Sequence, residues 1–291
     1  QALHWKTKEG LVRGCACRGT AGIAHVSCLV EQAKILVAEA EENNLGLKVL
    51  NERWKRWHTC GLCEQHYHGV VACALGWACW KTYLGRPETD QLFGLAMSVL
   101  GSSLTTVDHH EDALSVKEAR LSSMRRLNAP EESILIIQGN LAVTYQALGR
   151  FDEALFLKRD VYFGTVKLLG EEHSETLIEA GNYAYCLLSL QRFEEAKSLL
   201  RKKIPVARRV LGESHEITIR VRTVYARVLY KDDGATLDDL REAVTTLEEV
   251  EPIARRVLGG AHPLTGGIEK SLQIARAALR AREALSPGGG A

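Results

Sequence analysis

The feature that most constrains this chain is a segment that recurs at nearly constant spacing in its second half. The segments are LGEEHSET (169–176), LGESHEIT (211–218) and LGGAHPLT (258–265), so their starting positions are offset by 42 and then by 47. Between them, NLAVTYQALGRFDEAL (140–155) matches NYAYCLLSLQRFEEAK (182–197), again at the first of these offsets. A fixed period of this length indicates a repeat architecture, in which each repeat is one supersecondary element stacked on its neighbours.

Weaker copies extend the pattern. LNAPEESI (127–134) precedes the first linker by the same offset, and LTTVDHHEDAL (104–114) is a degraded copy of the central segment. VYARVLYKDDGATLDDLREAV (224–244) matches the same segment with the extra residues DDGAT at its turn, which lengthens the spacing there. We therefore expect helical repeats over residues 89–285, followed by a flexible tail at 286–291.

Each repeat is expected to be two antiparallel helices. Small residues recur where the paired helices must approach closely: Ala142, Ala184 and Ala226 on the first helix, and Ala154, Ala196 and Ala243 on the second. Each Leu-Gly pair should end the second helix, because glycine tolerates the left-handed C-cap. The Thr or Ser that follows should cap the next helix through its hydroxyl. One pair cannot bury its apolar face alone, so the pairs must stack into a superhelix with a concave surface.

The recurring NLA..Y...G.F.EA core and LG..H..T linker resemble the tetratricopeptide repeat, in the 42-residue form found in kinesin light chains. The resemblance implies an all-α superhelix whose groove, lined by the first helices, binds a protein or peptide. In that family asparagines on the first helix hold a peptide backbone, and the matching residues here are Asn140 and Asn182, whereas the third repeat has Val224. The alternative is that each asparagine bonds only a neighbouring turn.

Cysteines are concentrated at the other end of the chain, since seven of the eight lie at or before Cys79. This placement in a large helical chain favours reduced thiols and metal binding over a secreted disulfide framework. The formal charge of +1 argues against a nucleic-acid or acidic-membrane surface, and no stretch of about 18 apolar residues predicts a membrane span. We expect a small irregular domain at 1–69, a buried connecting helix within 70–88, and a cytoplasmic or nuclear location.

Potential metal ligands in the first domain occur as three closely spaced pairs. These are Cys15-x-Cys17, His25-x-x-Cys28 and Cys60-x-x-Cys63. Zn²⁺ takes four nitrogen or sulfur ligands in tetrahedral geometry. Six residues cannot share one such ion, so either one pair is idle or a fourth pair is missing.

The segments CACRGTAGIAHVSCL and WHTCGLCEQHY resemble the RING-CH type of zinc finger, because the residues around the ligands match along with their spacing. In that family four pairs interleave over two ions. The resemblance implies that Cys15, Cys17, Cys60 and Cys63 hold one Zn²⁺. It makes His25 and Cys28 half of a second site, whose leading Cys-x-x-Cys would precede Cys15. No cysteine precedes Cys15 and the chain begins with Gln, so we expect it to be a fragment of a longer protein.

The chain departs from the RING-CH pattern at several positions, and the resemblance also implies a function. The leading pair is absent, Ala24 precedes the histidine, and Gln32 stands where the family often has Trp. RING-CH fingers recruit a ubiquitin-conjugating enzyme and promote ubiquitin transfer, with zinc in a structural role. No phosphate loop, G-x-S-x-G or H-E-x-x-H motif suggests other chemistry. The hypothesis is a ubiquitin ligase whose repeats select a target; the alternative is a non-enzymatic scaffold with a structural zinc module.

The remaining cysteines and histidines are expected to be structural. Cys73, Cys79 and Cys186 lie in apolar helical segments and should be core residues, since a free thiol behaves as a small hydrophobe. One histidine stands in each linker, where a turn role is favoured over metal binding: His173, His215 and His262. Three more flank the last cysteine pair, where they are surface residues or substitute ligands: His58, His66 and His68.

Overall fold

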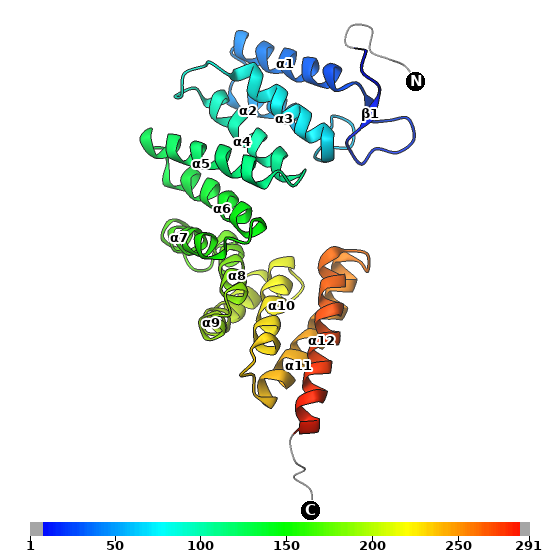
Figure 1. The fold of residues 1–291 in the computed structure, drawn as a ribbon, viewed down its shortest axis with the longest axis vertical. Coiled ribbons are helices and arrows are strands. Elements are labelled where there is room, and N and C mark those ends of the chain that lie inside the picture. Colours follow the sequence, from blue (N-terminus) through cyan, green and yellow to red (C-terminus); the bar gives the residue numbers. More distant parts are fainter. Residues whose placement is uncertain (1–7, 286–291) are drawn as a thin grey trace, which may run out of the picture. The chain divides into compact units, whose positions relative to one another are not determined.

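The computed structural model describes residues 8–285, which form twelve α-helices, one 3-10 helix and a two-stranded sheet (Figure 1). The chain divides into two compact units, which we call unit 1 (residues 1–148) and unit 2 (residues 149–291). Within the described residues, none of the helices combines the length and apolar character needed to cross a bilayer. The tail expected at 286–291 lies outside the described residues.

Unit 1 begins with the small sheet and continues through six helices and η1. The strands β1 and β2 are antiparallel, with Val12 opposite Ala24. The elements in chain order are β1 (Val12–Arg13), β2 (Ile23–Ala24), α1 (Val26–Glu42), α2 (Leu47–Trp54), η1 (Lys55–Trp57), α3 (Gly69–Tyr83), α4 (Gln91–Thr105), α5 (His110–Arg126) and α6 (Glu131–Ala147). The helix expected within 70–88 is α3, which packs against α4.

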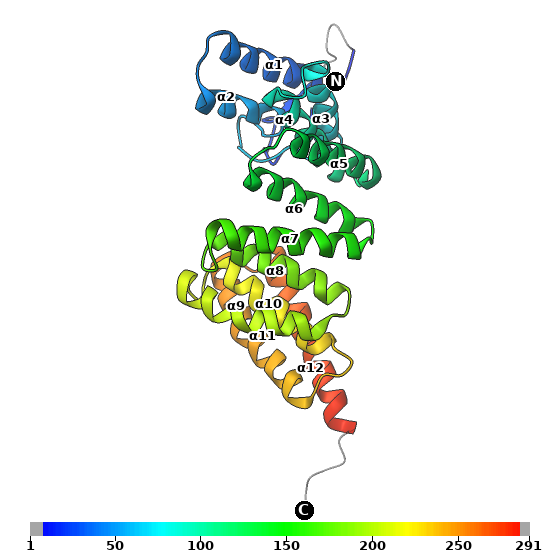
Figure 2. The same cartoon turned by 90° about the vertical axis from the view of Figure 1, so that its left-hand side faces the viewer.

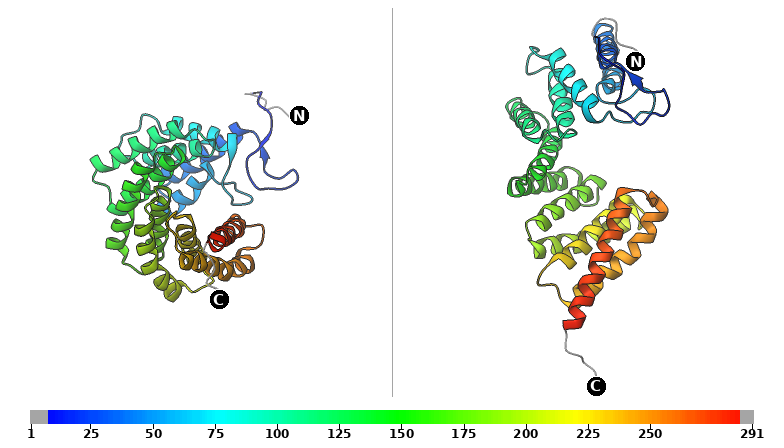
Figure 3. Two further views of the ribbon diagram at one scale, coloured as in Figure 1. Left: turned by 60° about the horizontal axis from the view of Figure 1, so that its bottom comes forward. Right: turned by 45° about the vertical axis from the view of Figure 1, so that its right-hand side comes forward.

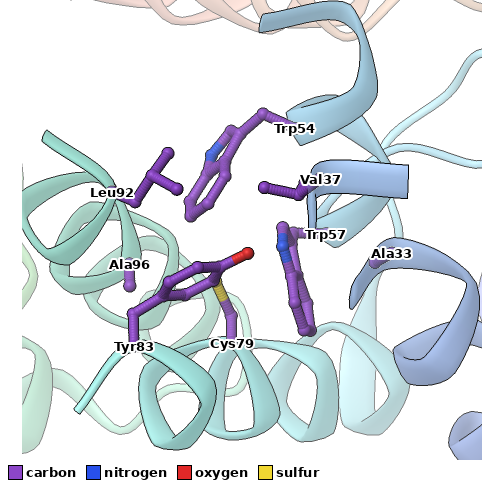
Figure 4. Packing of buried hydrophobic residues seen from close by; sticks show 8 residues of the cluster. All are labelled: Ala33, Val37, Trp54, Trp57, Cys79, Tyr83, Leu92 and Ala96. Carbon is purple, nitrogen blue, oxygen red and sulfur yellow. The ribbon is translucent and has the colours of Figure 1, made fainter. Parts of the chain in front are cut away.

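An aromatic cluster forms the core of the first half of unit 1. The ring centroids of Trp54 and Tyr83 are 5.2 Å apart, and those of Trp57 and Tyr83 are 6.1 Å apart with an edge-to-face orientation. Figure 4 shows Tyr83 and Cys79 projecting from α3 toward the two tryptophans, with Val37 of α1 beside them. These contacts tie α1, α2, η1, α3 and α4 into one core, which fixes the chain segments on either side of the cysteine pairs.

Unit 2 consists of six helices in which each packs against the next. They are α7 (Phe151–Leu169), α8 (Ser174–Ser189), α9 (Phe193–Leu211), α10 (Glu216–Lys231), α11 (Leu237–Leu258) and α12 (Pro263–Leu285). Figures 2 and 3 show these helices lying side by side in antiparallel order. The all-α repeat fold of stacked helix pairs is therefore as expected from the repeat period.

The small residues of the repeat lie where the helices touch. Ala142 in unit 1 and the equivalent alanines of unit 2 are fully buried: Ala154, Ala184, Ala196, Ala226 and Ala243. Because a methyl group keeps two helix axes close, the recurrence of alanine at these positions sets the spacing of the pairs. Cys79 and Cys186 are fully buried as expected, while Cys73 is half-buried beside the Leu100 cluster.

The linkers end and start helices by a mechanism that sequence reasoning only half anticipated. Gly170, Gly212 and Gly259 follow α7, α9 and α11 with φ of +87°, +88° and +90°, as expected for the Leu-Gly pairs. The prediction that hydroxyls cap the next helix is wrong. The cap of α8 is His173, whose ring Nδ1 accepts the Glu175 N–H at 3.2 Å.

The same imidazole cap recurs at the following linkers. Nδ1 of His215 accepts the Ile217 N–H, and Nδ1 of His262 accepts the Leu264 N–H, each at 3.2 Å. Thr176 is instead fully buried in the first turn of α8, and its hydroxyl donates back to the Gly170 carbonyl at 2.7 Å. The three histidines are thus turn residues that cap the N-terminus of the following helix.

Candidate metal centre and repeat surface

Two loops of unit 1 present the cysteine pairs. Cys15 and Cys17 lie between β1 and β2, and Cys60 and Cys63 lie in a turn directly after η1. This turn is closed by a bridge between Thr59 and His66 and by a hydrogen bond from the Cys60 N–H to the Gln65 carbonyl at 2.9 Å. Each short turn therefore aims two thiols to one side.

The two loops are joined, and their thiols converge. The His68 N–H donates to the Gly14 carbonyl at 2.8 Å, which links the second loop to the first. All four sulfur atoms of Cys15, Cys17, Cys60 and Cys63 lie within 4.8 Å of one another, and Cys17 Sγ is 3.8 Å from Cys60 Sγ. A zinc–sulfur bond of about 2.3 Å places the sulfurs of a regular tetrahedron about 3.8 Å apart. The donor set and the spacing therefore fit Zn²⁺.

Gly22 allows this close approach. It has φ of +70°, and a Cβ there would lie 2.6 Å from Cys17 Cβ and 2.7 Å from Cys15 Sγ. Only glycine leaves space for both thiols in this backbone conformation. The sequence alone did not reveal this requirement, because no pattern along the chain reports a contact across the loop.

The pKa values of the cysteine thiols indicate that the ionised cluster requires a cation. Burial raises the pKa of Cys15, and burial with hydrogen bonds donated by the Cys17 thiol to Cys15 and Cys63 raises the pKa of Cys17 to about 12. Burial acts in the same direction at Cys60, but the N–H groups of Cys63 and Leu62 outweigh it and lower that pKa to about 7. Several thiolates so close together repel one another, and a divalent cation removes that repulsion.

His25 and Cys28 lie apart from this cluster. They stand at the first turn of α1, where His25 is the N-cap residue and its Nδ1 is 3.8 Å from Cys28 Sγ. The group of four thiols does not include them. The structure thus brings the first and third pairs together and leaves the second pair separate, which is the division that the RING-CH resemblance implies.

A cavity not anticipated from the sequence lies beside the second loop. It has a volume of about 480 Å³, and its walls include Trp54, Trp57, Leu95, His58 and His66. The two histidine Nδ1 atoms are 3.4 Å apart. Burial, together with the neighbouring His66 ring, lowers the pKa of His58 to about 4. Neither histidine ring belongs to the thiol cluster.

The two asparagines of the repeat surface differ in their surroundings. Asn140 is exposed on α6. Asn182 is half-buried on α8, and its Nδ2 donates to Glu179 Oε1 at 3.2 Å. The local hydrogen bond that was one of the two alternatives is therefore present at Asn182. Val224 at the equivalent position of α10 is buried.

Comparison with known proteins identifies the repeats. A family model described as tetratricopeptide repeat matches residues 135–175, from α6 to the first turn of α8. No curated protein sequence matches the chain.

Two solved structures share its fold. A crystal structure of the nearly identical TPR-like repeats of a Podosopora anserina putative kinesin light chain has a TM-score of 0.54 and 20% identity, over 80% of this chain and 97% of that one. BtubC (BKLC) from P. vanneervenii has a TM-score of 0.52 and 16% identity, over 92% of this chain and 95% of that one. The chain therefore contains tetratricopeptide repeats and has structural neighbours among kinesin-light-chain-like proteins.

Proposed function

We propose that this chain is a protein-interaction protein with a structural Zn²⁺ ion held by Cys15, Cys17, Cys60 and Cys63. The ion stabilises the first segment of unit 1, which runs from β1 to the second cysteine loop. The observation that carries the zinc proposal is the convergence of four thiols within 4.8 Å of one another, with the Cys17 and Cys60 sulfurs at the separation of a tetrahedral site. The tetratricopeptide repeats support the protein-binding part, because stacked helix pairs present extended surfaces for proteins or peptides.

Zinc in this position is structural. Four thiolates close the coordination sphere, so no position remains for a reacting water or substrate. The cysteine loops themselves have little regular structure, and the two strands that flank Cys15 and Cys17 have two residues each. Bound metal therefore contributes directly to the folding free energy of these loops. The reduced thiols that this requires are consistent with the cytoplasm or nucleus, where we place the protein.

Metal content tests the proposal. We expect protein purified without chelators to contain one equivalent of zinc per chain, measured by mass spectrometry of the elements. Cys60→Ser should reduce the zinc content by at least tenfold, because a hydroxyl replaces one thiolate ligand. Cys73→Ser, a change at a half-buried cysteine outside the cluster, should keep the full equivalent. Unmodified protein without metal, or equal zinc in both variants, would exclude the site.

A ubiquitin ligase is a second candidate, because the structure divides the ligand pairs as in the RING-CH resemblance. In this proposal the first segment recruits a ubiquitin-conjugating enzyme and the repeats hold the target. The chemistry would be positioning rather than covalent catalysis. The His25–Cys28 pair needs two further ligands to complete its site, so activity in the RING-CH manner would require a second pair of ligands beside it.

Autoubiquitination tests this candidate. The chain, with a Cys-x-x-Cys segment added before residue 1, should form ubiquitin conjugates with at least one of a panel of conjugating enzymes, and Cys28→Ser should abolish them. The same extended protein carrying Cys73→Ser should remain active. Absence of conjugates across the panel, with zinc bound at full stoichiometry, would leave the non-enzymatic scaffold as the function.

The repeat surface has its own test. We propose that Asn140 and Asn182 bind the backbone of a peptide partner, as the resemblance to kinesin light chains implies. Asn140 is exposed, so Asn140→Ala should weaken binding of a peptide selected from a random library by about tenfold, which corresponds to about 1.4 kcal/mol. Unchanged affinity in both Asn140→Ala and Asn182→Ala would exclude this role.

A further inference from the structure

The second helices of the repeats carry two different kinds of buried residue at one position. Four residues after the buried alanine, α5 has Lys117 and α7 has Lys158, whereas α9 has Leu200 and α11 has Leu247. Both lysines are nearly as buried as the leucines, with exposed fractions of 8% and 4%. A buried ammonium group needs compensation that a leucine does not.

Unit 2 shows how the compensation is supplied. Lys158 Nζ lies 3.2 Å from an oxygen of Glu179 on α8, three residues before Asn182. At the positions equivalent to Glu179, α10 has Val221 and α12 has Ile268, and both are apolar and buried. The two positions therefore change together: a lysine is matched by a carboxylate, and a leucine is matched by an aliphatic residue.

In unit 1 a buried lysine has no matching carboxylate on the next helix. The residue three before Asn140 is Ile137, so Lys117 faces an aliphatic residue where Lys158 faces a carboxylate. Lys117 Nζ donates to Thr105 Oγ1 at 2.9 Å and Thr144 Oγ1 at 2.7 Å, and reaches the Asn140 carbonyl only at 3.4 Å. In the part of the chain that the structure describes, Lys117 has no ion pair, and burial lowers its pKa to about 8.

A small cavity with a second cation lies at this place. It has a volume of about 20 Å³ and is bordered by Lys117, Arg120, Ile137, Asn140 and Ser102. Such a space holds about one water-sized group. Arg120 Nε is buried there without a hydrogen-bond partner, and burial lowers the pKa of this guanidinium. Two positive groups thus border a space that lacks the acidic group present in the next repeat.

We propose that this cavity between α4, α5 and α6 is a binding site for a carboxylate supplied from outside the chain. One carboxylate oxygen would occupy the place that Glu179 fills beside Lys158, accept from Lys117 in place of its long bond to the Asn140 carbonyl, and accept from Arg120. The carboxylate is either a free small acid or the acidic side chain of a bound protein. The site does not depend on zinc or on ubiquitin transfer.

The test follows the Lys117 side chain by NMR in protein with ¹³C-labelled lysine, with the resonance assigned by its loss in Lys117→Leu. Sodium acetate, titrated at constant ionic strength against sodium perchlorate, should shift this resonance saturably and raise its apparent pKa by on the order of one unit. Ile137→Glu supplies the carboxylate from within the chain. It should raise the same pKa without acetate and abolish the response.

Ile136→Glu is the matched control, because the adjacent Ile136 is 58% exposed and does not border the cavity. It adds the same charge and should leave the acetate response unchanged. The peptides acetyl-Ala-Glu-Ala-amide and acetyl-Ala-Gln-Ala-amide identify the source. Binding of the Glu peptide at least tenfold tighter than acetate, with none of the Gln peptide, supports a protein side chain; equal binding of acetate and the Glu peptide supports a free acid.

Two outcomes would overturn the proposal. One is the absence of a saturable acetate response in the unmodified chain. The other is a response that persists in Ile137→Glu although its circular dichroism shows the native helical content.

Discussion

Gly22 is the residue on which the geometry of the thiol cluster depends most directly. We expect Gly22→Ala to lower the affinity for Zn²⁺ by at least tenfold, because the new methyl group meets Cys15 and Cys17 and the backbone has positive φ. Competition with a chromophoric chelator measures this. Gly19→Ala, which has φ of +63° and open space around its Cβ, separates the contact from the backbone strain. Equal affinity in the two variants would show that the contact is unimportant.

The histidine caps give a second prediction for single residues. His215→Ala removes the acceptor for the Ile217 N–H at the start of α10 and should lower the free energy of unfolding by about 1 kcal/mol. Asn, which is a preferred N-cap residue, should restore most of it. Hydrogen exchange of the first turn of α10 is the measurement, since it is local. If His215→Asn exchanges as fast as His215→Ala, the ring stabilises the linker by packing instead.

At the residue scale, the sequence predicted the ligand pairs but not the residues that cap the helices. The cysteine pairs could be matched because their spacing and neighbours resemble a known arrangement, and the structure brings Cys15 and Cys17 to Cys60 and Cys63. The histidine cap was missed because a Thr three residues later is the commoner capping residue. In the structure that Thr points back to the preceding helix.

At the scale of helices, Lys117 illustrates what periodicity leaves out. The repeat period predicted the alanine contacts and the helix ends, because these recur in every pair. It could not predict the surroundings of Lys117, because those arise from one substitution on a neighbouring helix, Ile137 in place of the glutamate found on α8. The consequence of such a substitution can be recognised only when the structure shows which residues of the two helices are in contact.

The buried charge of Lys117 predicts that the stability of unit 1 depends on pH. The pKa of Lys117 is about 8 in the folded chain and about 10.4 in the unfolded chain. The unfolded state therefore binds more protons between these values, so the free energy of unfolding of unit 1 should rise with pH there, by up to about 1.4 kcal/mol per unit. Below pH 8 the full cost of burying the charge is present.

Lys117→Leu should remove that rise and make unit 1 more stable at pH 7, by about 1–3 kcal/mol. The hydroxyls of Thr105 and Thr144 keep their own acceptors, the carbonyls of Gly101 and Asn140. Urea unfolding followed by tryptophan fluorescence reports on unit 1, because every tryptophan lies at or before Trp80. The other charged groups around this position are the same in both proteins, so the difference isolates Lys117. Parallel pH profiles would contradict the assignment.

At the scale of the whole chain, the thiol cluster is coupled to helical structure and not only to loops. Cys15 and Cys60 pack in one buried group with Tyr67, Val71 and Leu75. Of these, Val71 and Leu75 belong to α3, which in turn packs on α4. Loss of metal should therefore loosen the first half of α3 together with the two cysteine loops, and not stop at residue 69.

Removal of zinc by a chelator should thus accelerate amide exchange over residues 12–75 while α7–α12 exchange as before, because the helices of unit 2 have their own buried alanine contacts. A loss of about 3 kcal/mol or more of metal binding energy corresponds to a hundredfold or faster exchange in the affected segment. Hydrogen exchange with mass spectrometry resolves the two regions, and Cys60→Ser should reproduce the chelator pattern while Cys73→Ser should not. Faster exchange throughout unit 2 would mean that the repeats depend on the metal, and unchanged exchange in residues 12–75 would mean that packing around Tyr67 alone holds the segment.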